Sequence, residues 1–295
     1  MTSHSEFGER TPGSEVAKTF GDQIRGKTST LSFSSLDEYV IDLLMVVLIT
    51  GVGPNGIGAT TTLAFASQAP KLLILASRTK SKLEAVASDV RQAYPGVRVE
   101  IVLLDLGSQE SIRTAAAEVT RLTDRLDILI NNAALVVYTR QATTEGIEMQ
   151  FGVNHIGPFL FTNLLLPLLR NAAKTNPAGA TRVVSLTSAG HRLSPVRFSD
   201  YNLKSNQVPP EEDHVKPLPG AFGRTTEDGY SGIVAYGQSK TANILFTLYL
   251  QQHLSKQGIS AYTLHPGCKY HPGAALELMR IETLTVDGNK RSRPI

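Results

Sequence analysis

The chain is poor in the residues that mark several protein classes. Its 295 residues include one cysteine, Cys268, and no tryptophan. A single cysteine excludes an internal disulfide and suits a reducing compartment, so we expect a cytoplasmic protein. The seven histidines show no metal-ligand spacing such as His-Glu-x-x-His, and we therefore expect no metal site.

Strong charge and long apolar runs are also missing. The net charge of +3 is small and dispersed, which argues against a nucleic-acid partner. The longest apolar run, Leu43 to Thr50, is far short of the roughly 20 residues that span a bilayer. The N-terminus lacks a basic-then-apolar signal pattern. With 41% hydrophobic residues and a mean hydropathy of −0.06, the composition predicts a soluble protein with no membrane span.

Apolar strand-like runs alternate with helical patterns along the chain. Alternation of this kind predicts one α/β domain, a doubly wound parallel sheet flanked by helices and joined by right-handed crossovers. The predicted strands are Val46–Thr50, Leu72–Ser77, Arg98–Asp105, Asp127–Ala133, Arg182–Ser188, Ile259–His265 and Thr283–Val286. The predicted helices are Ala59–Gln68, Lys80–Tyr94, Ser108–Leu122, Glu145–Asn171 and Ala235–Leu254. Such sheets bind ligands beyond the carboxyl ends of their strands.

The most informative feature is the pair Tyr236 and Lys240, four residues apart in Ala-Tyr-Gly-Gln-Ser-Lys. The segment that follows reads as a helix, so the two side chains project from one face. An ammonium beside a phenol favours the phenolate and lowers a tyrosine pKa that is ordinarily about 10. A tyrosine tuned in this way exchanges a proton with an alcohol or carbonyl. The pair alone is weak, because tyrosine and lysine at this spacing are also common on solvated helix faces.

A glycine-rich turn follows the first predicted strand, in Thr50-Gly-Val-Gly-Pro-Asn-Gly-Ile-Gly58. Glycines let the backbone turn tightly and approach a pyrophosphate, and the N-terminus of the next helix favours its negative charge. A glycine cluster in an arbitrary loop usually marks only a turn. Its position between a strand and a helix favours a dinucleotide site.

Together these motifs resemble the short-chain dehydrogenase/reductase family, and the resemblance runs from about Val46 to Gly267. The local sequence, including Phe-Gly-Val-Asn-His-Ile-Gly-Pro-Phe-Leu, is most similar to fungal retinol-dehydrogenase-like NADP-dependent reductases. The resemblance implies a Rossmann-like catalytic domain. It also implies a catalytic set of Asn154, Ser188, Tyr236 and Lys240.

The same resemblance implies which residues hold the cofactor. Tyr236 and Lys240 belong to that set as well as to the catalytic one. The other implied positions are Gly51, Asn55, Gly56, Ile57, Gly58, Arg78, Asp105, Leu106, Asn132, Ala133, Pro266 and Gly267. Two structural alternatives stay open at this point. Ser188 could cap the following turn, and Asn154 could be an ordinary helix residue.

Cofactor choice depends on the end of the second predicted strand, Ile74-Leu-Ala-Ser-Arg-Thr-Lys. An NAD enzyme usually places a carboxylate there to bind the adenosine ribose. Here no acidic residue occurs before Glu84, and Arg78 can pair with a phosphate as a charged fork. The alternative is a solvated arginine at a helix start. We expect NADP(H).

Pro158 affects the backbone hydrogen bonding of Asn154, one of the implied catalytic residues. It has no N–H and cannot bond the carbonyl of Asn154, four residues earlier. If the helix runs through this point, that carbonyl is freed and the helix kinks. The family resemblance implies a water at such a carbonyl, in a proton relay toward the lysine. Alternatively, Pro158 ends a first helix after Gly157.

The chain departs from the family pattern in three places. We interpret 1–45 as an N-terminal extension, partly helical or disordered, with an insertion at 29–45. Within the catalytic domain, 46–295, a Pro-, Gly- and charge-rich segment at 191–229 reads as an inserted surface loop near the substrate. After Gly267 only Cys268 to Glu282 remain to cover the substrate, and no threonine occurs within a few residues of Pro266-Gly267. This shortened cover predicts an open pocket, slow turnover and loose substrate selection.

The sequence therefore predicts hydride transfer between NADP(H) and a small-molecule carbonyl or alcohol. A cofactor-binding protein without turnover, such as a redox-sensing or interaction module, is the alternative. An extended-type epimerase shares Tyr-x-x-x-Lys, but its larger carboxyl-terminal region is missing. The sequence is compatible with a homo-oligomer. It is also compatible with retinoid, steroid, polyketide or xenobiotic carbonyl substrates.

Overall fold

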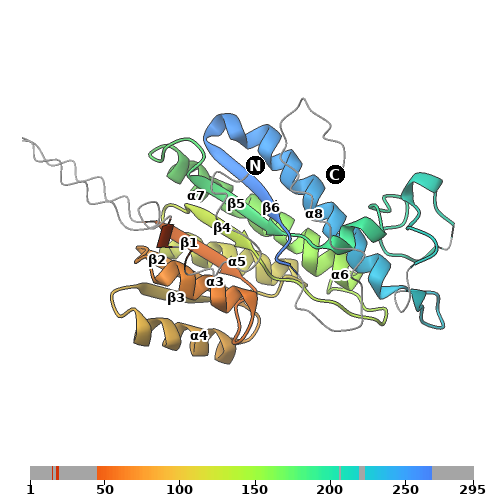
Figure 1. Cartoon of the computed structure of the whole chain (residues 1–295), viewed down its shortest axis with the longest axis horizontal. Coiled ribbons are helices and arrows are strands. Elements are labelled where there is room, and N and C mark those ends of the chain that lie inside the picture. Colours follow the sequence, from red (N-terminus) through yellow and green to blue (C-terminus); the bar gives the residue numbers. More distant parts are fainter. Residues whose placement is uncertain (1–14, 16–17, 20–44, 206, 219–222, 268–295) are drawn as a thin grey trace, which may run out of the picture.

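The computed structural model describes residues 15, 18, 19, 45–205, 207–218 and 223–267. Within them the chain forms a six-stranded parallel sheet in the order β3-β2-β1-β4-β5-β6, with helices on both faces (Figure 1). This is the predicted single-domain, Rossmann-like α/β fold. The strands are β1 (Val46–Thr50), β2 (Leu72–Ser77), β3 (Arg98–Leu103), β4 (Ile128–Asn131), β5 (Thr181–Leu186) and β6 (Ile259–Leu264).

The helices alternate with the strands as expected. The long ones are α3 (Ile57–Ala66), α4 (Lys80–Ala93), α5 (Gln109–Leu122), α7 (Gly157–Ala173) and α8 (Gly232–Leu254). The short ones are α6 (Met149–Phe151), a π-type turn η1 (Gly152–Ile156), and the 3₁₀ turns η2 (Ala189–Leu193), η3 (Pro210–Glu212) and η5 (Ser255–Gln257).

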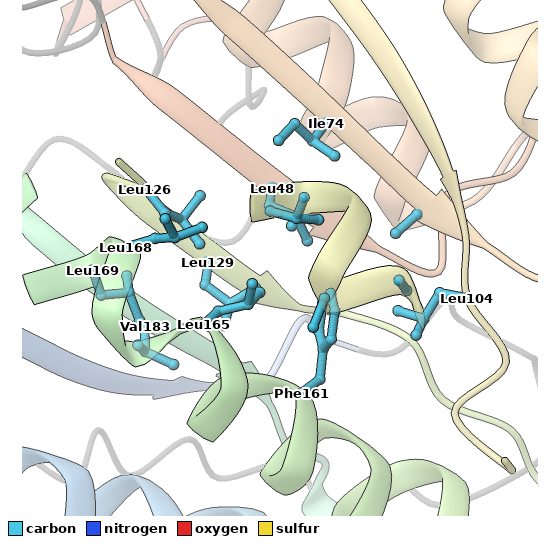
Figure 2. Packing of buried hydrophobic residues seen from close by; sticks show 14 of the residues in the cluster. Leu48, Ile74, Leu104, Leu126, Leu129, Phe161, Leu165, Leu168, Leu169 and Val183 are labelled. Carbon is cyan, nitrogen blue, oxygen red and sulfur yellow. The ribbon is translucent and has the colours of Figure 1, made fainter. Parts of the chain in front are cut away.

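Side-chain alternation along β1 explains why helices pack on both faces of the sheet. Val46 and Leu48 face the layer of α5, α7 and α8, whereas Val47 and Ile49 face α3 and α4. All of these side chains are buried, because successive residues of a strand point to opposite faces. Figure 2 shows the first face, where Leu48 lies near side chains of β4, β5 and α7.

The first two predicted strands coincide with β1 and β2. The next four end one or two residues early, because the chain leaves the sheet to form the loops of the site. The predicted strand Thr283–Val286 lies outside the described residues. So do the N-terminal extension, apart from 15, 18, 19 and 45, and the predicted cover after Gly267.

The predicted helix Glu145–Asn171 was wrong at its start. Helix α6 begins at Met149 because Glu148 is the N-cap residue, and its carboxylate accepts from the N–H groups of Gln150 and Phe151. The helix then runs through Pro158, after the π-type turn η1, instead of ending at Gly157. Helix α8, in contrast, begins earlier than predicted. It starts at Gly232, three residues before Ala235, with Ser231 as its cap.

One helical stretch among the described residues, Met149–Ala173, is long and apolar enough to cross a membrane by length and composition. Its most apolar window has a mean hydropathy of 1.2, and 56% of that window is buried inside the fold. Phe161, Leu165 and Leu169 project from it into the core shown in Figure 2. We therefore assign the stretch to the core.

Candidate active site

The turn after β1 has room only for glycine at its critical positions. Gly51 has a φ of +70°, and a Cβ on it would lie 2.5 Å from the Cα of Ala133. A Cβ on Gly58 would lie 2.8 Å from the carbonyl of Gly51. Helix α3 starts at Ile57 without a side-chain cap or an acidic residue in its first turn. Its N-terminal N–H groups are thus placed to meet an anion.

Hydrogen bonds tie this turn to the loop after β4. The Asn132 side chain donates to the carbonyls of Thr50 and Gly51, at 2.8 and 3.2 Å. The Thr50 hydroxyl accepts from the N–H groups of Asn132 and Ala133, both at 3.1 Å. The two loops therefore form one wall, which fixes the ends of β1 and β4 relative to each other.

A cleft of about 650 Å³ opens along this wall, at the carboxyl edge of the sheet. It runs from the end of β2, past the glycine turn, to the first turns of α8. A drug-sized or dinucleotide ligand fits a cleft of this size and position. The lining residues named in the sequence prediction are Gly51, Gly56, Ile57, Arg78, Leu106, Asn132, Ala133, Tyr236, Lys240 and Pro266.

The other predicted cofactor residues lie beside the cleft. Asn55, with a φ of +60°, shapes the turn, and Gly58 is packed beneath it. The Asp105 carboxylate accepts from the N–H of Gly107 at 2.9 Å and so stabilises its own turn. Its neighbours Leu104 and Leu106 line the cleft. Gly267 is the last described residue after Pro266.

Tyr236 and Lys240 line the inner end of the cleft from one face of α8. The Lys240 Nζ lies 5.4 Å from the centroid of the Tyr236 ring. It donates to the Leu186 carbonyl at the end of β5, at 3.0 Å. Burial lowers the pKa of Lys240 to about 8, because desolvation penalises the ammonium. The ammonium form therefore still predominates at neutral pH.

Ser188 lies near the tyrosine, after β5. A Cβ on Gly190 would be 3.0 Å from the Tyr236 ring and 3.6 Å from the Ser188 hydroxyl, so Gly190 is close to both. The Ser188 hydroxyl accepts from the N–H of Gly190 at 3.2 Å, which makes it the cap of η2. That bond uses an acceptor lone pair and leaves the hydroxyl proton available to donate.

Asn154 lies in η1 and is almost fully buried. Its amide spans the loop after β4, because it accepts from the N–H of Leu135 at 2.8 Å and donates to the Leu135 carbonyl at 3.0 Å. It also donates to the Ser239 hydroxyl, at 3.1 Å, and Ser239 donates to the Tyr236 carbonyl, at 2.7 Å. Asn154 is thus connected to the tyrosine through one intervening hydroxyl.

Sequence reasoning missed several residues of the cleft. Apart from Lys82, they contribute mainly backbone and apolar surface, as Val52, Leu135 and Leu186 do. Lys82 is different, because it brings a charge. The signal for it was a basic residue one helical turn after Arg78.

Among the described residues, no group of three or more His, Cys, Asp or Glu side chains is placed so that it could hold a metal ion.

Comparisons with known proteins agree with this geometry. A family model described as short chain dehydrogenase matches residues 45–202. The chain is 32% identical over 268 residues to Oxidoreductase fscI of Fusarium equiseti, covering 90% of this chain and 96% of that protein. It is 37% identical over 221 residues to human Retinol dehydrogenase 13, covering 75% of this chain but only 58% of that protein's length.

Solved structures show the same fold. An uncharacterised protein from Mycobacterium paratuberculosis is 32% identical, with a TM-score of 0.56 over 76% of this chain and 68% of its own. Pseudomonas aeruginosa RhlG, in an NADP complex, is 23% identical, with a TM-score of 0.53 over 75% of this chain and 71% of its own. NADH-dependent reductase A1-R′, complexed with NAD, is 20% identical, with a TM-score of 0.55 over 76% of this chain and 78% of its own.

The family match covers more than half of the chain, and the alignment with the Fusarium oxidoreductase covers nearly all of it. The cleft is lined by the glycine turn and by Tyr236 and Lys240. The chain belongs to the short-chain dehydrogenase family of oxidoreductases, whose cofactor is a nicotinamide dinucleotide.

Proposed function

We propose that the protein is an NADP-dependent oxidoreductase that interconverts a small-molecule carbonyl and the corresponding alcohol. The observation that carries the proposal is the Tyr236–Lys240 pair at the inner end of the cleft, with Ser188 close by. The retinol dehydrogenases among its relatives support the reaction class. Structures of similar fold hold either NADP or NAD, so cofactor choice rests on the residues of this chain.

The preference for NADP rests on the end of β2. Arg78 lines the cleft there, and the first turn of α4 contains no acidic residue. A carboxylate at this place would repel the 2′-phosphate of NADP and bind the free ribose hydroxyl of NAD instead. An exposed guanidinium matches a phosphate as a fork of donors.

The bound cofactor would supply or accept the hydride. In the reducing direction, the Tyr236 hydroxyl donates its proton to the carbonyl oxygen as that oxygen becomes an alcohol. Ser188 donates a hydrogen bond to the same oxygen and orients it. The Lys240 ammonium favours the phenolate left on Tyr236, because a nearby cation stabilises an anion.

Asn154 acts as a positioning residue in this proposal. Its amide holds the Leu135 loop, which lines the cleft, and through Ser239 it also holds the backbone of Tyr236. Pro158 cannot bond the Asn154 carbonyl, and in this proposal that carbonyl would hold a water on the path to Lys240. The phenolate would then regain its proton through that path.

Two measurements test the proposal. Purified protein is mixed with NADPH and a panel of aldehydes and ketones, and loss of NADPH absorbance is followed. Turnover of at least one carbonyl is expected, whereas tight NADPH binding with no oxidation across the panel would favour a cofactor-binding module.

Cofactor choice is tested with Arg78→Ala. We expect NADPH binding to weaken by about 2 kcal/mol, on the order of one charged hydrogen bond, with NADH binding little changed. Equal losses for the two cofactors in a titration by fluorescence or calorimetry would place Arg78 away from the 2′-phosphate.

A further inference from the structure

We propose that Gln150 is a positioning residue for the carbonyl substrate, because its amide holds the loop after β4 against the first turn of α8. The proposal rests on the proposed function and deepens it. Gln150 has no exposed surface, so it acts through the walls of the cleft and not by touching the reacting atoms.

The Gln150 side chain lies where α6, the loop after β4 and the start of α8 meet. Its Nε2 donates to the Gly232 carbonyl at 2.7 Å, to the Val137 carbonyl at 3.0 Å and to the Tyr230 hydroxyl at 3.0 Å. Val137 belongs to the loop after β4, and Gly232 is the first residue of α8. One buried amide therefore joins two segments that are far apart in the sequence.

The partners determine which way the amide points. The Val137 and Gly232 carbonyls can only accept hydrogen bonds, so the nitrogen of the Gln150 amide must face them. The Tyr230 hydroxyl donates to the Glu148 carboxylate at 2.7 Å, which leaves its lone pairs to accept from Gln150. Two N–H groups then serve three acceptors, and one N–H is shared.

This arrangement leaves one atom of the amide without a partner. Among the described residues, the Gln150 Oε1 is buried and accepts no hydrogen bond. A buried amide oxygen without a donor is unfavourable, and a side chain that only filled the space would not carry that cost. The bonds to the two carbonyls are therefore what Gln150 contributes beyond packing.

Gln150 and Asn154 hold the same loop from positions four residues apart on α6 and η1. Asn154 accepts from the N–H of Leu135 and donates to its carbonyl, whereas Gln150 binds Val137, two residues further along. Leu135 lines the cleft. The two amides together fix this wall of the cleft, one against the backbone of Tyr236 through Ser239 and the other against the start of α8.

The loop after β4 touches α8 closely at this junction. A Cβ on Gly232 would lie 2.3 Å from the Val137 carbonyl oxygen and 2.9 Å from the Tyr138 Cα. Tyr236 follows Gly232 by one helical turn. A carbonyl that reaches the Tyr236 hydroxyl would lie between α8 and the loop, so the spacing of the two segments sets the room for it. A loop released from α8 would misplace the substrate relative to that hydroxyl.

The test compares Gln150→Met with Gln68→Met. Methionine is unbranched and similar in length to glutamine, so it fills the space but has no donor. Gln68 is also a buried amide, with 5% of its surface exposed, but it follows the end of α3 and donates to its neighbour Ser67. The control therefore removes a buried amide away from the junction.

Steady-state rates are measured with NADPH and a carbonyl that the parent reduces, and NADPH affinity and stability in urea are measured on the same samples. We expect Gln150→Met to raise the KM for the carbonyl and to lower kcat/KM about tenfold, with NADPH affinity within about twofold of the parent. Gln68→Met should lose stability but keep the parental KM. A purely structural role would lower the folded fraction of both variants without changing KM.

A second variant acts on the same junction from the side of α8. In Gly232→Ala the new Cβ would push the Val137 carbonyl away while the Gln150 amide stays in place. The same rise in KM with unchanged NADPH affinity is expected, and this variant decides the result if Gln150→Met does not fold. Gly96→Ala is its control, because a Cβ there meets nothing within 4 Å.

The outcomes separate this inference from the function on which it rests. If Gln150→Met and Gly232→Ala match their controls in KM and kcat, the inference is overturned and the proposed function stands. A loss of NADPH affinity as large as the loss in kcat/KM also overturns it, because Gln150 would then support the whole cleft. If the parent reduces no carbonyl, the proposed function fails and the inference fails with it.

Discussion

The proposed cofactor side of the molecule and its proposed substrate side are built in different ways. On the cofactor side, β1 and β2 are almost completely buried, and the loops after β1 and β4 are joined by hydrogen bonds between Thr50 and Asn132. On the substrate side, the 45 residues between Leu186 and Gly232 form only short 3₁₀ turns and loops among the described residues. Figure 1 shows this stretch, in teal and cyan, gathered at one end of the molecule.

Some large side chains outside the cofactor side are also strongly exposed. Phe198 in this stretch is 72% exposed, and Tyr138 in the segment after β4 is 67% exposed. A few buried anchors hold the segment. Gln238 of α8 accepts from the N–H of Arg197 and donates to the Tyr201 carbonyl, both at 2.9 Å. The comparison teaches that cofactor binding and substrate binding should respond separately to substitution.

The largest effect is expected from Tyr236→Phe, at the junction of the two sides. The variant loses only the hydroxyl, so carbonyl reduction should fall by roughly 10² to 10⁴, the usual contribution of a general acid. NADPH affinity should stay within about twofold of the parent, because the ring still fills the same place. Steady-state rates and a binding titration give the two numbers. Substantial turnover by the variant would contradict the assignment.

Gly51→Ala should damage the cofactor side. The new Cβ would collide with Ala133 at a φ that alanine avoids, so we expect a loss of about 3 kcal/mol in stability or NADPH affinity. Chemical denaturation with and without NADPH measures both. Gly96→Ala is the control, since a Cβ there meets nothing within 4 Å. Equal behaviour of the two variants would mean that the turn is not tightly fitted.

Lys240 gives a pH signature at the same junction. Its folded-state pKa is about 8, below the ordinary 10.5, so the unfolded chain binds more protons between these values. The stability of the parent relative to Lys240→Met should therefore be constant below pH 8 and rise from pH 8 to about 10.5. The total change is on the order of 3 kcal/mol. Denaturation curves across this range test it, and a flat difference would show that the lysine is not desolvated.

The smallest effect belongs to the substrate side. Gln238→Ala leaves the N–H of Arg197 without its partner, at a cost of about 1 to 2 kcal/mol. We expect the KM for the carbonyl to rise and proteolysis of the inserted segment to accelerate, with NADPH affinity unchanged. Gln252→Ala, an exposed position on the same helix, should change none of these. A loss of NADPH affinity in Gln238→Ala would show that the two sides are coupled.

The sequence predicted the cofactor side well, because its signals are local. Buried parallel strands are continuous apolar runs, so Val46–Thr50 and Leu72–Ser77 could be bounded to the residue. The glycine turn and the residue type at the end of β2 also depend on neighbours in the chain. These features brought most of the predicted cofactor residues to one cleft.

Other features depend on contacts between distant residues and left no local trace. The π-type turn at Asn154 forms where α7 meets the loop before α5, and a Cβ on Gly157 would lie 2.4 Å from the Leu106 carbonyl. The start of α6 depends on Glu148, a buried carboxylate that also accepts from the Tyr230 hydroxyl. Lys82 is one of two lysines in the first turn of α4, and its stem beside Gly53 distinguishes it from Lys80.

The most direct measurement follows the hydride itself. The protein is incubated with NADPH in which both hydrogens at C4 of the nicotinamide are replaced by deuterium and with the carbonyl panel, and the products are analysed by mass spectrometry. The account predicts at least one alcohol that carries a single deuterium on the former carbonyl carbon, formed in step with NADP⁺ and lost in Tyr236→Phe. NADPH that binds the protein but transfers deuterium to none of the carbonyls would contradict it.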